Sequence, residues 1–370
     1  MLTKYMLLHP TVFACGDKYQ IFVSLSEDAV MKVRVGDEIY YDHINGILRS
    51  ATKIHKVEIP MELLNREKRY TVCYKRILER KPYFPPSEEW IEFTVDFRPV
   101  KEDGDINIYH ISDSHTLSNE AIKAGSYFGD KLDLLILNGD IPDESNTPES
   151  FDEIFKISSV ITEGKIPVVY ARGNHDTRGS LAEFMSYNIP TLNGKTYYTF
   201  RLGCIWGIVL DCGEDKLDTN AEYNETTCFH IHRLEQTEFI KDVIKNSAFE
   251  YNAPGIKHRL LISHIVFSYC HREPFNIETE LYTEWSKLIR ENIKPDLSLH
   301  GHYHKTEICP VGSWLDSYGQ PATAIIGGKP SFDKNNGNSF TGCALTLKEN
   351  GLKKVVFNDS CGNILSEEII

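Results

Sequence analysis

The sequence predicts an α/β (α+β) protein with a small all-β sandwich domain in front of it, and three observations carry this prediction. Up to about residue 98 the chain has the pattern of short β-strands. After a charged stretch with Pro and Gly at 98–105, strand-like and helix-like segments alternate, which is typical of a sheet covered by helices on both faces. Polar side chains follow the apolar strands, which predicts a site at one edge of that sheet.

The N-terminal region, bounded at residues 1–100, is expected to be a β-sandwich of the fibronectin or immunoglobulin type. Apolar and polar side chains alternate along 90–97, the period of a half-buried strand. Similar segments lie at 19–25, 31–35 and 69–75. Asn45-Gly46, between two strand-like runs, is a strong hairpin signal. Short strands at this spacing favour a sandwich, and a packing, targeting or shielding role is expected for it.

The second region, bounded at 105–370, is expected to be the catalytic domain. Its apolar segments have the length of buried strands, and amphipathic segments between them predict helices. The tail at 340–357 predicts an antiparallel pair of strands. The strands are expected at 106–112, 133–138, 166–171, 197–211, 259–263 and 296–299, and the later helices near 232–248 and 281–293.

Composition narrows the class of protein. The 370 residues are 41% hydrophobic and 25% charged, as in a soluble globular protein. A net charge of −13 argues against binding to anionic lipid or to a nucleic-acid duplex. No apolar run reaches the roughly 18 residues of a membrane-spanning helix. Nine scattered cysteines and no evident signal peptide favour a cytoplasmic location, and nothing in the sequence predicts the oligomeric state.

Five predicted strands end in side chains that bind metal ions. Each group alone is weak evidence for a metal site, because Gly, Asn and Asp are ordinary turn residues and a lone His is usually a hydrogen-bonded packing residue. Their joint occurrence at strand ends is hard to reach by chance. In chain order the groups are Asp113 with His115, Asp140 with Asp143, Arg172 to Asp176 (RGNHD), His264, and His300 with His302 and His304.

With these groups the sequence resembles the calcineurin-like metallophosphoesterase superfamily, over roughly residues 105–330. The family's blocks DxH, GDxxD, GNH[DE], a lone His and GHxH are present as DSH, GDIPD, GNHD, His264 and GHYH. The resemblance implies a four-layer αββα sandwich with two metal ions. It assigns Asp113, His115 and His304 to one ion, Asn174, His264 and His302 to the other, and Asp140 to both.

Phosphoester hydrolysis explains these residue types. Two metal ions lower the pKa of a bridging water, so that a metal-bound hydroxide attacks phosphorus, and they clamp the phosphoryl group. Imidazole and carboxylate ligands without thiolates favour Mn, Fe or Zn, and no organic cofactor is expected. His175 is the predicted proton donor to the leaving group, oriented by Asp176. Arg172 either binds phosphate or forms a structural salt bridge.

The resemblance also touches purple acid phosphatases, a branch with an N-terminal β-sandwich. By analogy with that branch, His271 and Arg272 are candidate substrate-binding residues. The chain has Asp143 where that branch has Tyr, and His115 where it has Gly, so the purple Fe³⁺ site is not expected. The predicted function is a phosphomonoesterase for a small phosphorylated substrate. Open alternatives are a phosphodiesterase for nucleotides or glycerophosphodiesters, and a non-catalytic metal-binding or interaction protein on the same fold.

Overall fold

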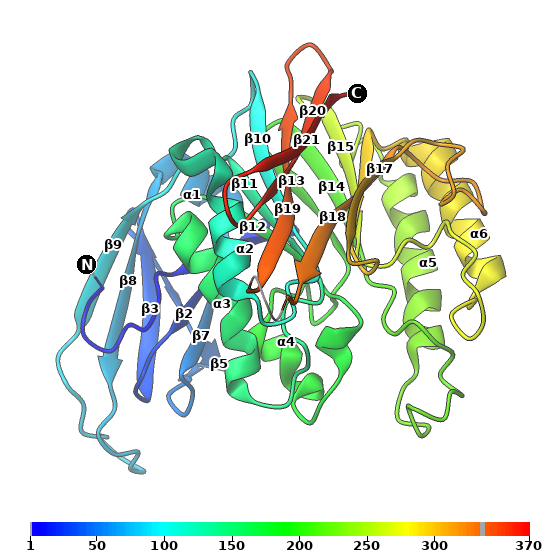
Figure 1. The fold of residues 1–370 in the computed structure, drawn as a ribbon. Coiled ribbons are helices and arrows are strands. Elements are labelled where there is room, and N and C mark those ends of the chain that lie inside the picture. The colour runs from blue at the N-terminus through cyan, green and yellow to red at the C-terminus, as the bar shows by residue number, and fades with distance from the viewer. Residues whose placement is uncertain (1, 334–336) are drawn as a thin grey trace.

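Two β-sheets pack face to face at the centre of the computed structural model, which describes residues 2–333 and 337–370. Helices cover the outer face of each sheet, so the order of layers is αββα (Figure 1). The largest apolar core lies between the sheets, and separate cores lie under each helical layer. The predicted fold class is confirmed.

The first sheet has a parallel centre, β10, β11, β12 and β1, with antiparallel strands at both sides. Its outer face packs on α2 (Ser118–Gly125) and α3 (Pro148–Thr162). Its strands, in spatial order, are β21 (Ile364–Ile369), β20 (Lys353–Asp359), β19 (Ser339–Leu347), β10 (Ile106–Ile111), β11 (Leu134–Asn138), β12 (Pro167–Ala171), β1 (Thr11–Cys15), β2 (Lys18–Ser24) and β7 (Ile54–Pro60).

The second sheet packs its outer face on α5 (Phe229–Lys245) and α6 (Thr279–Leu288), with Trp206 and Trp285 fully buried in that core. The end of β18 pairs with β19, which connects the two sheets. The predicted antiparallel tail is present as β19 and β20. In spatial order the strands are β13 (Tyr198–Leu202), β14 (Ile205–Leu210), β15 (His258–Ser263), β16 (Leu297–His300), β18 (Ala324–Ser331) and β17 (Lys305–Cys309).

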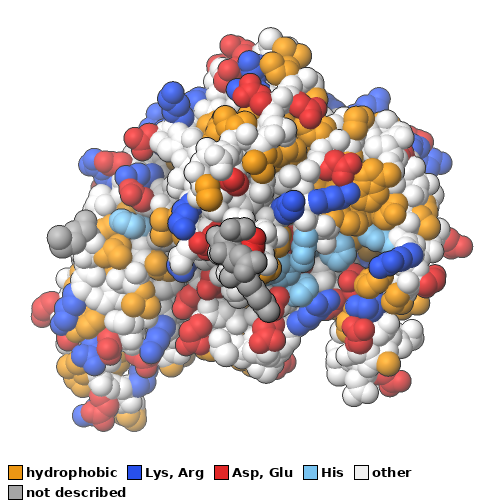
Figure 2. Space-filling model, in the orientation of Figure 1, with side chains coloured by type: hydrophobic (Ala, Val, Ile, Leu, Met, Phe, Trp, Pro, Cys, Tyr) orange, Lys and Arg blue, Asp and Glu red, His pale blue; other side chains and the backbone are white. Residues whose placement is uncertain are grey.

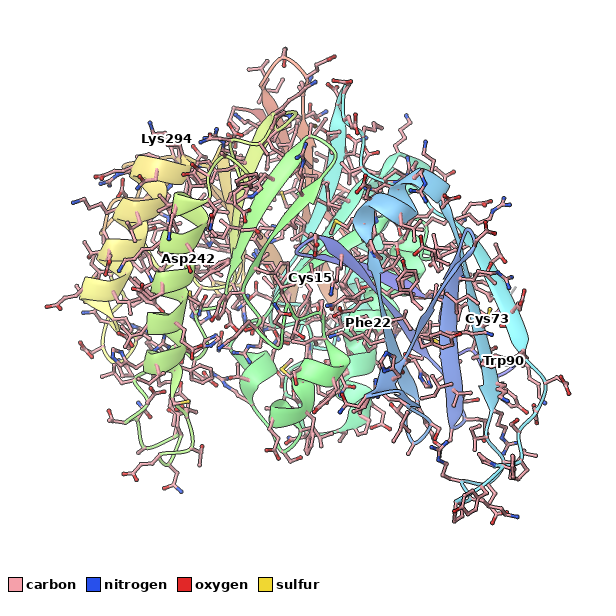
Figure 3. The ribbon with its side chains drawn as sticks, turned by 180° about the vertical axis from the view of Figure 1, so that it is seen from behind. Cys15, Phe22, Cys73, Trp90, Asp242 and Lys294 are labelled. Atoms are coloured by element: carbon pink, nitrogen blue, oxygen red, sulfur yellow. The ribbon has the colours of Figure 1, made fainter. Side chains whose placement is uncertain are left out.

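The N-terminal region contains a small antiparallel sheet, and its remaining strands do not form a separate layer. One of its sheets is antiparallel, in the order β4 (Glu38–Tyr41), β3 (Ala29–Val35), β8 (Arg69–Arg76) and β9 (Ile91–Asp96). Its other strands, β1, β2 and β7, belong to the first catalytic sheet, because β1 pairs in parallel with β12. Seen from behind, Cys15 and Phe22 lie towards the middle of the molecule, and Cys73 and Trp90 lie in the outer sheet (Figure 3).

The hairpin turn predicted at Asn45-Gly46 is present in this region. Asn45 and Gly46 both have positive φ, 49° and 87°, and form the two-residue turn between β5 (His43–Ile44) and β6 (Ile47–Leu48). A helix that the sequence analysis did not predict, α1 (Met61–Glu67), follows β7. The division into independent units at 1–100 and 105–370 stays a prediction, although the shared sheet shows that the two parts are hydrogen-bonded through β1 and β12.

Phe13 offers a test of this coupling. Its ring is fully buried on β1 and makes edge contacts with Phe155 of α3 and Tyr170 of β12, at centroid distances of 6.5 and 6.4 Å. We expect Phe13→Ala to lower the free energy of unfolding by about 3–5 kcal/mol in one cooperative denaturant transition. Phe249→Ala, at a ring 87% exposed, is the control and should change it by less than about 0.5 kcal/mol. Two separate transitions in Phe13→Ala would contradict the coupling.

Candidate metal centre

The five predicted strand ends meet at one edge of the two packed sheets. β10, β11 and β12 deliver their loops from one sheet, and β15 and β16 deliver theirs from the other. Backbone hydrogen bonds connect the loops directly. The amide of Asp113 donates to the carbonyl of Gly139 (3.0 Å), and the amide of Gly301 donates to the carbonyl of His264 (2.9 Å). The ligand-bearing loops are therefore fixed relative to one another.

The predicted metal ligands form two clusters. In the first, the Nε2 atoms of His115 and His304 are 2.9 Å apart, and His304 Nε2 is 3.7 Å from Asp113 Oδ1. In the second, His264 Nε2 is 3.0 Å from Asp140 Oδ2.

The second cluster is completed by His302, whose Nδ1 is 3.0 Å from Asn174 Oδ1. Asp140 connects the clusters, because its Oδ2 is also 4.0 Å from His115 Nε2. All seven predicted ligands therefore lie together, in the grouping that the resemblance implied.

The chemistry of the clusters fits cations. Asp113 is fully buried, and its Oδ2 has no hydrogen-bond partner among the described residues. Burial and the neighbouring Asp140 raise the pKa of Asp113 to about 7, so its charged form is costly here without a cation beside it. Burial lowers the pKa of His115 to about 4 and that of His302 to about 3, so both rings are neutral and keep the lone pair that a metal needs.

Close approach of the backbone explains the glycines of the motifs. A Cβ at Gly173 would lie 2.2 Å from Asp140 Oδ1, and one at Gly301 would lie 2.6 Å from Asp113 Oδ2. Any larger residue would push a ligand out of its cluster. Ligands themselves adopt the left-handed region, with φ of 56° at Asp113, 52° at Asp140 and 71° at His302. Such backbone strain concentrates at functional sites.

His175 lies beside the first cluster, with its ring 4.7 Å from that of His115. Its Nδ1 donates to the carbonyl of Asp143 (2.9 Å), and its Nε2 accepts from Arg178 Nη1 (3.0 Å). The ring is therefore the neutral Nδ1–H tautomer here. The carboxylate of Asp143 accepts from His115 Nδ1 at 3.0 Å, which leaves Nε2 of His115 for a metal.

The structure corrects the role expected for Asp176. Its buried Oδ2 accepts hydrogen bonds from the backbone amides of Gly173 (2.6 Å) and Asp140 (3.1 Å). The contacts of the His175 ring go instead to Asp143 and Arg178. Asp176 therefore holds the two ligand loops together and does not orient His175, because its carboxylate faces the backbone behind the site.

The guanidinium groups of Arg172 and Arg178 have different acidic partners. Arg172 Nη2 forms a salt bridge with the fully buried Asp211 (2.7 Å), which is the structural alternative left open by the sequence. The guanidinium beside His175 belongs to Arg178, held by Glu214 through two hydrogen bonds of 2.7 and 2.8 Å. A signal existed: Arg178 is three residues after His175, and the 3₁₀ turn His175–Thr177 brings such positions together.

The remaining candidates lie near the second cluster. The His271 ring is 6.2 Å from that of His302, and its Nε2 is 3.0 Å from the hydroxyl of Tyr303. Arg272 is exposed. Their role in substrate binding stays a prediction. Figure 2 shows histidine side chains gathered in a band on one face of the molecule, with Lys and Arg side chains beside them.

Comparison with known proteins decides the family. Residues 106–306, more than half of the chain, match the family model described as calcineurin-like phosphoesterase. The chain belongs to this family. The Asp and His clusters described above lie within the matched residues and are the candidate metal-binding groups.

Individual relatives are distant. A probable cyclic nucleotide phosphodiesterase of Fibrobacter succinogenes is 37% identical over 71 residues, which are 19% of this chain and 26% of that protein. The chain thus spans about a quarter of the length of this curated relative.

Two solved structures share the fold of this calcineurin-like phosphoesterase. Purple acid phosphatase PPD1 from yellow lupin (Lupinus luteus) seeds has a TM-score of 0.60 at 13% identity, covering 98% of this chain and 73% of that one. PhoD has a TM-score of 0.54 at 12% identity, covering 99% and 93%. None of the helices in the part of the chain described here is long and apolar enough to cross a membrane.

Proposed function

We propose that this calcineurin-like phosphoesterase is a dinuclear-metal phosphomonoesterase that acts on a small phosphorylated substrate. The observation that carries the proposal is the position of Asp140, whose carboxylate lies within 4.0 Å of ligand nitrogens in both clusters. Asp113, His115 and His304 would hold one ion with Asp140, and Asn174, His264 and His302 the other. Imidazole, carboxylate and amide donors suit Mn, Fe or Zn.

Two bound ions would supply an activated water and positive charge for the phosphoryl oxygens. The chain's own residues add hydrogen-bond donors beside the clusters. The hydrogen bonds that Arg178 donates to the Glu214 carboxylate raise the pKa of Arg178, so its guanidinium is permanently charged. One N–H of its Nη1 points to His175, within reach of a substrate bound at the first cluster. A phosphomonoester has one more charged oxygen than a diester, so it gains more from the positive charge of Arg178.

His175 is the proposed proton donor to the leaving oxygen. Its hydrogen bonds decide which ring nitrogen can carry that proton. Its Nδ1–H is used by the carbonyl of Asp143, so only Nε2 can reach a substrate. In the structure Arg178 donates to Nε2. We propose that the substrate takes over the Arg178 hydrogen bond, that Nε2 then takes up a proton from water to give the imidazolium, and that this proton passes to the leaving alkoxide, which returns the ring to the Nδ1–H form.

A phosphodiesterase is the second candidate, favoured by the relative from Fibrobacter succinogenes and its printed description as a probable cyclic nucleotide phosphodiesterase. The same metal ligands serve both ester classes. The two functions therefore differ in the residues around the phosphoryl group and not in the metal ligands.

A comparison of two esters separates these candidates. The chain loaded with Mn²⁺ or Zn²⁺ should hydrolyse p-nitrophenyl phosphate with a kcat/KM at least about tenfold above that for bis(p-nitrophenyl) phosphate, a difference of about 1.4 kcal/mol in transition-state binding. The readout is nitrophenolate release. The reverse order would establish the diesterase, and no release from either ester by the metal-loaded protein would contradict both.

The role of His175 predicts a dependence on the leaving group. His175→Ala should slow an alkyl phosphate by about 10²–10⁴-fold, because an alkoxide needs a proton to leave. It should slow p-nitrophenyl phosphate much less. Metal content should stay at the wild-type value, since the ring is not a proposed ligand, and this is checked by elemental analysis. Asn174→Ala is the matched neighbour and should lose metal instead. Equal slowing of both esters by His175→Ala would show that His175 binds phosphoryl oxygens and does not donate the proton.

A further inference from the structure

We infer that the substrate carries a flat aromatic ring, such as a nucleobase, which stacks on an aromatic wall beside the second metal cluster. The inference rests on the proposed function and specifies its substrate class. The aromatic wall consists of Tyr269, His271, Tyr303 and Trp314. These residues come from three loops, which follow β15, β16 and β17.

The wall is continuous with the metal ligands. Tyr303 stands between His302 and His304 in the sequence, and its ring centroid is 5.5 Å from that of His302. Trp314 extends the wall outward, 5.4 Å from Tyr303 and 5.0 Å from Tyr269. A phosphoryl group on the metal ligands would therefore place its organic substituent within reach of these rings. Figure 2 shows a hydrophobic patch directly beside the band of histidines.

The rings are held in place by their polar edges. The hydroxyl of Tyr303 and Nε2 of His271 are 3.0 Å apart, and the two rings are parallel to within 5° and offset, with centroids 5.7 Å apart. Trp314 Nε1–H donates to Glu307 Oε1 at 2.9 Å. Because these polar groups are satisfied within the protein, what the wall offers a ligand is its ring faces. Fixed rings lose little conformational entropy when a ligand stacks on them.

Charge at the wall suits a phosphorylated aromatic compound. Trp314 is 39% exposed, and Lys305 Nζ lies 3.6 Å from its ring centroid on one face, so a ligand would stack on the other face. Lys305 also forms a salt bridge with Glu307 at 2.7 Å. Lys305 directly follows His304, so this cation lies at the junction between the metal ligands and the wall. A nucleotide combines an anionic phosphate with a flat base, whereas a sugar or glycerol phosphate offers nothing to stack.

Trp90 is a matched control within the same chain. It is 38% exposed and has Lys32 Nζ 4.3 Å from its ring, as Trp314 has Lys305. It lies next to β9 in the outer N-terminal sheet, away from the metal clusters (Figure 3). A substitution there removes the same kind of surface tryptophan without touching the wall.

The kinetic test uses ester pairs that differ only in the ring. We expect wild-type kcat/KM for AMP to exceed that for ribose 5-phosphate by about 5- to 150-fold, the range of one base stacked on an aromatic side chain. Trp314→Leu should reduce this ratio at least fivefold, and Trp90→Leu should leave it unchanged. Methyl esters of both compounds replace them if the enzyme accepts only diesters. The same ratio in Trp314→Leu and wild type would overturn the inference.

A second pair identifies the ring. A preference for benzyl over ethyl phosphate that is also reduced in Trp314→Leu supports recognition of any flat ring, and a preference confined to the AMP pair supports recognition of a nucleobase. If the metal-loaded wild type hydrolyses none of these esters, the proposed function fails, and stacking is then judged by binding alone.

Fluorescence measures that binding without catalysis. Of the four tryptophans, Trp206 and Trp285 are buried, so in Trp90→Leu the exposed indole is Trp314. The methylene phosphonate analogue of AMP should quench Trp90→Leu saturably, and the corresponding analogue of ribose 5-phosphate should not. Trp314→Leu should show no saturable quenching. Equal quenching in both variants would overturn the aromatic wall as the binding surface.

Discussion

Buried negative charge at one edge of two packed sheets is the constraint on which the rest of this structure depends. Asp113 and Asp140 are both fully buried, and isolated carboxylates in such a place are very costly. Burial opposes a charge on His264, yet Asp140 and Asp113 together raise its pKa to about 10. A proton there partly compensates charge that two metal ions would balance. The motif glycines and left-handed ligand residues follow from packing these groups so closely.

The residues around the two carboxylates hold the ligand loops in place and add charge at the edge of the site. Asp176 binds the backbone of two ligand loops, and Asp143 fixes the rings of His115 and His175. Arg178 adds a permanent positive charge at the edge of the site, held by the buried Glu214. Farther out, the aromatic wall adds ring faces and the cation of Lys305. The proposed metal ligation, proton transfer and substrate recognition thus lie at increasing distance from one charge cluster.

Much of this was predictable from the sequence, because the signals are local. Apolar strands followed by metal-binding side chains predicted seven candidate ligands, which the structure brings together, and Asn45-Gly46 predicted a hairpin that is present. What failed depends on pairing between distant segments. The parallel pairing of β1 with β12 has no signature in either strand, so the sequence did not predict it. Asp176 was assigned to its sequence neighbour His175, although its carboxylate turns to the backbone of Asp140.

The central claim is that one carboxylate, Asp140, serves two metal ions. Elemental analysis tests it most directly, on protein stripped of metal, saturated with Mn²⁺ or Zn²⁺ and freed of excess ion. The account predicts two ions per chain. A content of one ion per chain at saturation would contradict it, because one of the two clusters would then be a hydrogen-bonded group of side chains without a metal.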